Sequence, residues 1–222
     1  MNFFLAIFAL ISAVHVSFII LRKEKLRRIS KCLVIPSLLA AYVAGAGNQL
    51  FFIIPALILG WIGDILLIKI QNRVFFMMGL ASFLLGHICY IVAFMGLLGI
   101  FGPGNAAGSA SINIPAILIF TPPTIALGAV VFRLIKPTKE MFVPVIVYMI
   151  VLVAMNFFGF QVFLFSPGVA GLLILSGCFN FMVSDTILAY YTFRKIKLSG
   201  AVLIMVYYIL AQAEIVLGLM WL

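Results

Sequence analysis

The sequence predicts an all-α fold, a polytopic bundle of eight transmembrane helices that forms a single membrane domain over residues 1–222. Of the 222 residues, 66% are hydrophobic and only 9% are charged, whereas a soluble domain carries roughly 45–50% apolar and about 25% charged residues. The mean hydropathy of +1.35 agrees. Such a composition excludes a cytosolic enzyme, a disordered chain and a disulfide-stapled secreted domain.

The eight spans follow from the apolar runs between polar stretches, because a helix needs about 20 mostly apolar residues to cross the hydrocarbon core. The predicted spans are 2–21, 32–46, 51–68, 75–98, 114–134, 141–160, 169–193 and 199–221. The second is short, and Pro122 and Pro123 interrupt the fifth. Basic residues follow the first run instead of preceding it, which indicates a transmembrane helix and not a cleaved signal peptide.

The basic residues predict the topology. All 14 Lys and Arg residues lie in alternate connections, at 22–31, 69–73, 133–139 and 194–197, whereas the connection 99–113 has none. The positive-inside rule therefore puts both termini on the non-cytoplasmic side. The net charge is +9, but the clusters of Lys and Arg are not interleaved with aromatic residues that could stack on nucleobases. We therefore expect membrane lipids, and not nucleic acid, as partners of this multi-pass protein of the cell membrane.

The two halves, 1–110 and 111–222, resemble each other at a few positions. An offset of 121 residues pairs Asp64 with Asp185, Arg73 with Arg194, Gly79 with Gly200, and His87 with Tyr208. The paired spans run in the same direction. We therefore expect a parallel four-plus-four internal repeat, and chance matching of a few positions is the alternative.

Three of the five acidic residues, Asp64, Asp185 and Glu214, lie within predicted spans. A carboxylate in hydrocarbon is costly, so it normally faces the bundle interior or a wet cavity and is a functional candidate. For Asp64 the alternative is a structural ion pair with the nearby Lys69. For Asp185 the nearest base, Arg194, is nine residues away, about 13 Å along a helix.

Further polar side chains accompany these acids in the third, fourth, seventh and eighth spans. They are His87, Tyr90, Asn180, Ser184, Tyr208 and Gln212. Gly86 beside His87 would allow another helix or a ligand to approach closely. The alternative for each of these residues is that it only forms a hydrogen bond between helices, and the alternative for His87 is an ordinary core histidine. Their concentration in four spans nevertheless favours a site.

Other chemistries lack their residues. Two histidines cannot form a zinc site without the carboxylates, and the sequence contains no GxSxG, P-loop or GxGxxG motif. The three cysteines, Cys32, Cys89 and Cys178, form no CxxC pair and favour packing. What remains is a pair of buried carboxyls. Burial raises the pKa of such a group. When two carboxyls lie close together, their pKa values move apart, so that one is an acid and the other a base at neutral pH. That pair suits hydrolysis of an acid-labile ether or acetal, without metal or cofactor.

Four short motifs resemble a known family. They are Gly63-Asp64-x-x-Leu67, Gly86-His87-x-x-Tyr90-x-x-x-Phe94, Ser184-Asp185-x-x-Leu188-Ala189 and Tyr207-Tyr208-x-x-Ala211-Gln212. In this order they are similar to the YhhN family, which includes bacterial YhhN proteins and the mammalian transmembrane lysoplasmalogenases. The resemblance runs from about residue 25 onward and includes the eight-span pattern. Glu214 has no place in the family pattern.

The resemblance implies hydrolysis of the vinyl-ether bond of lysoplasmalogen to a fatty aldehyde and glycerophosphoethanolamine or glycerophosphocholine. The two acids of the family match Asp64 and Asp185, which would be the catalytic pair. The polar companions would bind or orient the substrate and water, and basic residues such as Lys31, Lys69 or Arg73 would hold the substrate phosphate.

Two readings of another class stay open at this point. A proton-coupled transporter or lipid-binding membrane protein also uses intramembrane acids and repeats, although no inverted second half is present. A membrane subunit without activity of its own would leave three intramembrane carboxylates unexplained. Product formed in detergent micelles would discriminate, because transport needs two compartments.

Overall fold

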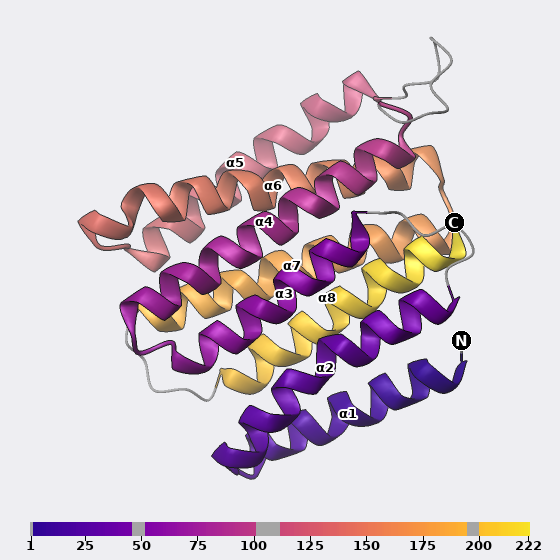
Figure 1. The fold of residues 1–222 in the computed structure, drawn as a ribbon. Coiled ribbons are helices and arrows are strands. Elements are labelled where there is room, and N and C mark those ends of the chain that lie inside the picture. The colour runs from indigo at the N-terminus through magenta and orange to yellow at the C-terminus, as the bar shows by residue number, and fades with distance from the viewer. Residues whose placement is uncertain (1, 46–51, 101–111, 195–199) are drawn as a thin grey trace. The chain divides into compact units, whose positions relative to one another are not determined.

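The computed structural model describes residues 2–45, 52–100, 112–194 and 200–222, and over these residues the chain is helical with no strand. The helices are α1 (Asn2–Ile20), α2 (Glu24–Gly45), α3 (Ile53–Leu66), α4 (Arg73–Leu97), α5 (Ile114–Ile135), α6 (Phe142–Phe165), α7 (Val169–Arg194) and α8 (Ala201–Trp221) (Figure 1). Two short 3₁₀ turns, η1 (Leu67–Lys69) and η2 (Lys139–Met141), follow α3 and precede α6. The all-α prediction is confirmed.

Seven of the helices in the described part of the chain, all except α3, are long and apolar enough to cross a membrane. These helices agree with the predicted multi-pass membrane protein. The third span, predicted at 51–68, is the exception, since α3 has 14 residues and extends about 21 Å at 1.5 Å per residue. The turn η1 prolongs it toward Lys69. The orientation of the termini and the internal repeat stay predictions.

Some sequence predictions fall on residues outside the described ranges. They are the bases Lys195 and Lys197, the span limits at residues 46, 51 and 199, the division at 110–111, and residues 101–111 of the base-free connection. The remaining predicted spans agree with the helices to within two residues, apart from α2 and α6. Helix α6 continues to Phe165, five residues beyond the predicted end at 160, because residues 161–165 are also apolar apart from Gln161.

Helix α2 begins at Glu24, eight residues before the predicted span at 32–46. The prediction that 22–31 is a loop was wrong, because hydropathy penalises charged residues that are nevertheless good helix formers. Glu24 lies in the first turn, where a negative charge interacts favourably with the helix dipole, and its carboxylate pairs with Arg27 at 2.6 Å. The turn between α1 and α2 is short, and Arg22 within it has a positive φ of 55°.

Helix α5 is continuous through Pro122 and Pro123, so the predicted interruption was wrong. Prolines remove N–H groups that would bond the carbonyls four residues earlier. In hydrocarbon, however, unwinding would leave still more backbone groups without partners, and membrane helices therefore tolerate proline. The neighbouring Thr124 hydroxyl donates to the Phe120 carbonyl at 2.6 Å, and the Asn113 side chain accepts from Ala116 N at the first turn.

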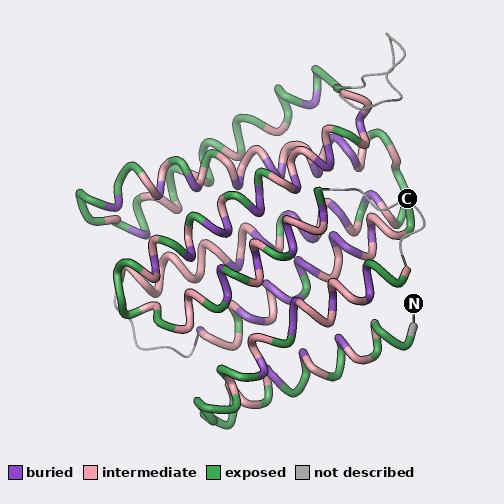
Figure 2. Tube along the Cα trace, in the orientation of Figure 1, coloured by how far each residue is buried: buried purple, intermediate pink, exposed green. Residues whose placement is uncertain are grey.

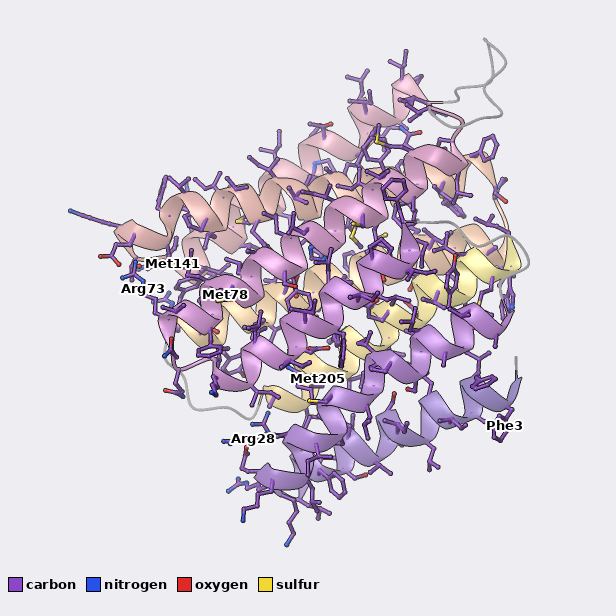
Figure 3. All side chains as sticks on the ribbon, viewed as in Figure 1. Phe3, Arg28, Arg73, Met78, Met141 and Met205 are labelled. Carbon is purple, nitrogen blue, oxygen red and sulfur yellow. The ribbon has the colours of Figure 1, made fainter. Side chains whose placement is uncertain are left out.

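The described chain divides into two compact units, Met1–Ala93 with Leu219–Trp221, and Phe94–Gly218 with Leu222. In the first unit, α1 and α2 form an antiparallel hairpin, and α3 packs on α2 (Figure 1). The basic residues gather at the turn of this hairpin, where Figure 3 shows Arg28 at the opposite end from Phe3. Five of the six bases at 22–31 belong to that turn or to the first two turns of α2.

In the second unit, α7 packs between α6 and α8. Two glycines set the close approach of α7 and α8. A Cβ on Gly177 would lie 2.8 Å from the Ala211 carbonyl oxygen, and one on Gly218 would lie 2.7 Å from the Ala170 carbonyl oxygen. Helix α5 contacts α6 and α7 but is exposed over most of its length (Figure 2), with Ala116 and Ile135 as its buried residues.

Candidate functional site

Asp64 of α3 forms a buried ion pair with Lys31 of α2. The carboxylate Oδ1 lies 3.2 Å from the ammonium Nζ, and the side chains of Lys31 and Asp64 are 12% and 4% exposed. The sequence predicted an ion pair with Lys69 as the alternative role of Asp64. The ion pair is present, but its partner is Lys31, 33 positions earlier. The prediction of Lys69 was wrong, since the Lys69 Nζ lies 4.7 Å from the centre of the Phe75 ring. Asp64 is therefore paired with an opposite charge in a largely buried position.

A proline and a tryptophan hold α2 and α3 together beside this pair. Pro36 has no N–H to donate to the Cys32 carbonyl four residues earlier in α2. The indole Nε1–H of Trp61 donates to that carbonyl instead, at 2.8 Å. Cys32 follows Lys31 in the chain, and Trp61 lies three residues before Asp64 on the same face of α3. The bond therefore fixes the two backbones where the ion pair forms.

On its other side, α2 is held by α1. The Nδ1 of His15 lies 2.8 Å from the Ser30 hydroxyl, which in turn donates to the Arg27 carbonyl at 3.1 Å. Both His15 and Ser30 are buried. Since Ser30 precedes Lys31, this contact fixes the rotation of α2 at the level of the ion pair.

The motif glycines allow α3 and α4 to pack closely. A Cβ on Gly63, the residue before Asp64, would lie 2.6 Å from the Phe83 ring. A Cβ on Gly86 would lie 3.2 Å from the Ala56 carbonyl oxygen. The Ser82 hydroxyl of α4 also donates to the Leu59 carbonyl of α3 at 2.6 Å. Gly86 thus allows another helix to approach closely, which is one of the two roles predicted for it.

His87 and Tyr90 lie on the buried part of α4. Both side chains are 1% exposed, and Phe94 one turn further is fully buried. The face that these three residues share is therefore the packed face of the helix. Their burial fits a site residue and a core residue equally.

Asp185 of α7 has a partner that the sequence did not indicate. Its Oδ2 accepts a hydrogen bond of 2.5 Å from the Tyr148 hydroxyl of α6, and Tyr148 is buried. A tyrosine within an apolar run needs an acceptor for its hydroxyl, so the residue type was the signal. The acceptor could not be chosen because no spacing rule connects residues 37 positions apart.

The other predicted residues of α7 contact α8. The Asn180 amide donates to a Glu214 carboxylate oxygen at 2.8 Å, and the Ser184 hydroxyl donates to the Ile204 carbonyl at 3.0 Å. This hydrogen bond also gives a partner to Glu214, a residue whose role the sequence left open. Ser184 therefore joins two helices through a main-chain carbonyl, which is a structural role.

Tyr208 and Gln212 of α8 are both buried. The Tyr208 ring packs edge-on against Phe181 of α7, with the ring centres 5.5 Å apart. The structure thus places Asp64, Lys31, His87 and Tyr90 in the first unit. It places Asp185, Asn180, Ser184, Tyr208 and Gln212 in the second.

Two further features bear on what the site can do. Across the described ranges, no three His, Cys, Asp or Glu side chains are grouped closely enough to hold a metal ion. An open groove of about 210 Å³ lies between α5, α6 and α7, with Gly128, Met149 and Thr186 among its lining residues. Its lining contains no charged side chain, so the carboxyls remain the candidates for chemistry.

The fold and the site define a class, a polytopic α-helical membrane protein with a hydrogen-bonded or ion-paired aspartate in each of two helical units. Comparison with protein families is more specific. The chain belongs to the YhhN family, whose family model matches residues 26–219. Searches of curated proteins and of solved structures found no match. The match begins within α2 and includes both aspartates, and α1 with its His15 precedes it.

Proposed function

We propose that the protein is a membrane-embedded ether hydrolase that cleaves the vinyl-ether bond of lysoplasmalogen. The products are a fatty aldehyde and glycerophosphoethanolamine or glycerophosphocholine. Family membership supports the proposal. The observation that supports it most is a pair of aspartates on apolar helices. Each is held by a polar side chain of the preceding helix: Lys31 holds Asp64, and Tyr148 holds Asp185. A carboxyl that is costly to place in a membrane helix and is held in one geometry is typical of a functional residue.

The chemistry of a vinyl ether matches two carboxyl groups. A proton adds to the carbon that is β to the ether oxygen, and the cation that results is stabilised by that oxygen as an oxocarbenium ion. Water then adds to the α carbon and loses a proton, giving a hemiacetal that collapses to the aldehyde and a glycerol hydroxyl. One carboxyl donates the first proton, and the second, as a carboxylate, stabilises the cation or activates the water.

The partner residues have distinct roles in this scheme. Lys31 binds the phosphate of the substrate, since an ammonium is a strong point-charge ligand for phosphate. The Tyr148 hydroxyl orients the Asp185 carboxylate. His87, Tyr90, Asn180, Tyr208 and Gln212 bind or orient substrate and water, and no metal or cofactor takes part.

The proposal is tested by measuring aldehyde release from lysoplasmalogen with purified protein in detergent micelles. Asp64→Asn and Asp185→Asn keep the size of each side chain and remove its acid–base function. We expect each to lower kcat at least about 100-fold, the range in which acid–base catalysis contributes. Glu214→Gln is the matched control, an intramembrane carboxyl outside the proposed chemistry, and we expect it to keep its activity.

The outcomes are distinct. Full activity in Asp64→Asn or Asp185→Asn would remove that residue from the mechanism. No aldehyde from the wild-type protein would favour the transporter or lipid-binding alternative, because a micelle has no second compartment.

A further inference from the structure

We propose that the Lys31–Asp64 ion pair is a switch that the phosphate of the substrate opens. This inference rests on the proposed function. When the phosphate binds the Lys31 ammonium, the ammonium leaves Asp64, and the Asp64 carboxylate takes up a proton from water. The protonated Asp64 then delivers this proton to the β carbon of the vinyl ether. After the product leaves, the Asp64 carboxylate pairs with Lys31 again.

In the resting structure, Asp64 is held in the form that cannot act as an acid. Its carboxylate lies 3.2 Å from the ammonium, and both side chains are largely removed from water. A buried carboxylate without a compensating charge is strongly disfavoured and is neutralised instead. The Lys31 ammonium therefore favours the carboxylate form of Asp64, and an anion that attracts Lys31 favours the protonated form.

Lys31 is placed to be reached by such an anion. It is the innermost base of the cluster at the start of α2, and Arg28 lies three residues before it, so the two share one face of the helix. Arg28 is exposed at the basic end of α2 (Figure 3). A phosphate that enters from this end meets Arg28 first and Lys31 next. The flexible four-carbon stem of lysine allows its ammonium to move from carboxylate to phosphate.

The frame around the pair stays fixed while the ammonium moves. The Trp61 indole is bonded to the Cys32 carbonyl at 2.8 Å, directly beside Lys31 and one turn from Asp64. Ser30 is held from the other side by His15. Because these bonds hold α2 to α3 and to α1 on either side of Lys31, the exchange needs only a rotation of the Lys31 side chain. The acid keeps its position relative to the bound phosphate.

The switch predicts that the phosphate of the substrate raises kcat and does not only lower KM. The test compares lysoplasmalogen with the matching alkenylglycerol, which has the same vinyl ether and no phosphate. We expect the wild-type protein to turn over the alkenylglycerol at least about 100-fold more slowly at saturation. Lys31→Met removes the counter-charge permanently, so we expect kcat for the alkenylglycerol to rise about tenfold or more and the preference to disappear.

Two variants serve as controls. Lys25→Met removes an exposed base of the same helix and should keep the wild-type preference. Lys31→Arg keeps the charge but forms a more rigid, bidentate carboxylate pair, and we expect it to be slow on both substrates. An equal loss of activity of Lys31→Met on both substrates would overturn the switch, because a plain structural role predicts that result.

A measurement without turnover separates the switch from the proposed function. We expect a saturated alkyl-ether lysophospholipid, which lacks the vinyl ether, to produce the infrared carbonyl band of a protonated carboxyl. The band should be missing in Asp64→Asn and with the alkylglycerol that lacks phosphate. No band in the wild-type protein overturns the switch even if aldehyde is released, whereas a band without aldehyde supports the switch and refutes the hydrolase.

Discussion

The bond between Trp61 and the Cys32 carbonyl exists because Pro36 leaves that carbonyl without its usual donor. Trp61→Phe removes the indole N–H and keeps an aromatic ring in the same place. In the wild-type background the carbonyl then has no hydrogen-bond donor in its helix. In a Pro36→Ala background it regains the N–H of residue 36 as a donor. The cost of Trp61→Phe should therefore depend on residue 36.

The size of this effect follows from the environment of the bond. Side-chain hydrogen bonds between membrane helices couple by about 0.6 kcal/mol on average and by up to about 1.7 kcal/mol. Leaving a buried acceptor without a donor costs about 1–3 kcal/mol. The bond is partly buried and 2.8 Å long, so we expect Trp61→Phe to cost about 1–2 kcal/mol. In the Pro36→Ala background we expect a loss below about 0.5 kcal/mol.

The assay is reversible unfolding in mixed micelles, in which the free energy of unfolding is compared across the four proteins of the double-mutant cycle. A coupling energy of about 1 kcal/mol between the two positions confirms the account. An equal cost of Trp61→Phe with proline and with alanine at position 36 would refute it. In that case the ring of Trp61, and not its N–H, would stabilise the α2–α3 contact.

Two further predictions concern the second unit and its packing. Gly177→Ala should lower the free energy of unfolding by about 1–3 kcal/mol, because its Cβ would lie 2.8 Å from the Ala211 carbonyl oxygen, a main-chain atom. Gly96→Ala, in a helix and with open space around the new Cβ, should be neutral or stabilising by up to about 1 kcal/mol, and an equal loss in both variants would contradict the packing argument. Tyr148→Phe should lower aldehyde release about tenfold and the free energy of unfolding by no more than about 1–3 kcal/mol, since it removes the hydroxyl that donates to Asp185. Unchanged release in this variant would limit Tyr148 to packing.

Much of the fold could be predicted because hydropathy reports directly on burial in a bilayer. Its errors have physical causes. The start of α2 was missed because the charged residues from Glu24 onward form helix as readily as apolar ones. The break at Pro122 was expected from behaviour in water, whereas a bilayer penalises an unwound backbone more than a missing hydrogen bond.

The two acids of the candidate site could be proposed from the sequence, but the side chains that hold them could not. Asp64 and Asp185 stand out because a carboxylate in an apolar run is rare. Their partners, Lys31 and Tyr148, come from other helices, and sequence spacing indicates neighbours only within one helix. Lys69 was close in the chain and for that reason misleading.

One further signal was available in the sequence. A proline within a span, such as Pro36, leaves a carbonyl that needs a donor from another helix. The two tryptophans of the chain were the natural donors to consider, and Trp61 is the one that the structure places there.

The central claim is that this membrane protein cleaves a vinyl ether by protonating carbon. It is tested most directly by running the reaction of the wild-type protein with lysoplasmalogen in heavy water and measuring the mass of the aldehyde. Protonation of the β carbon predicts an aldehyde that carries a single deuterium on the carbon next to the carbonyl. Aldehyde without that deuterium, or no aldehyde at all, would contradict the account.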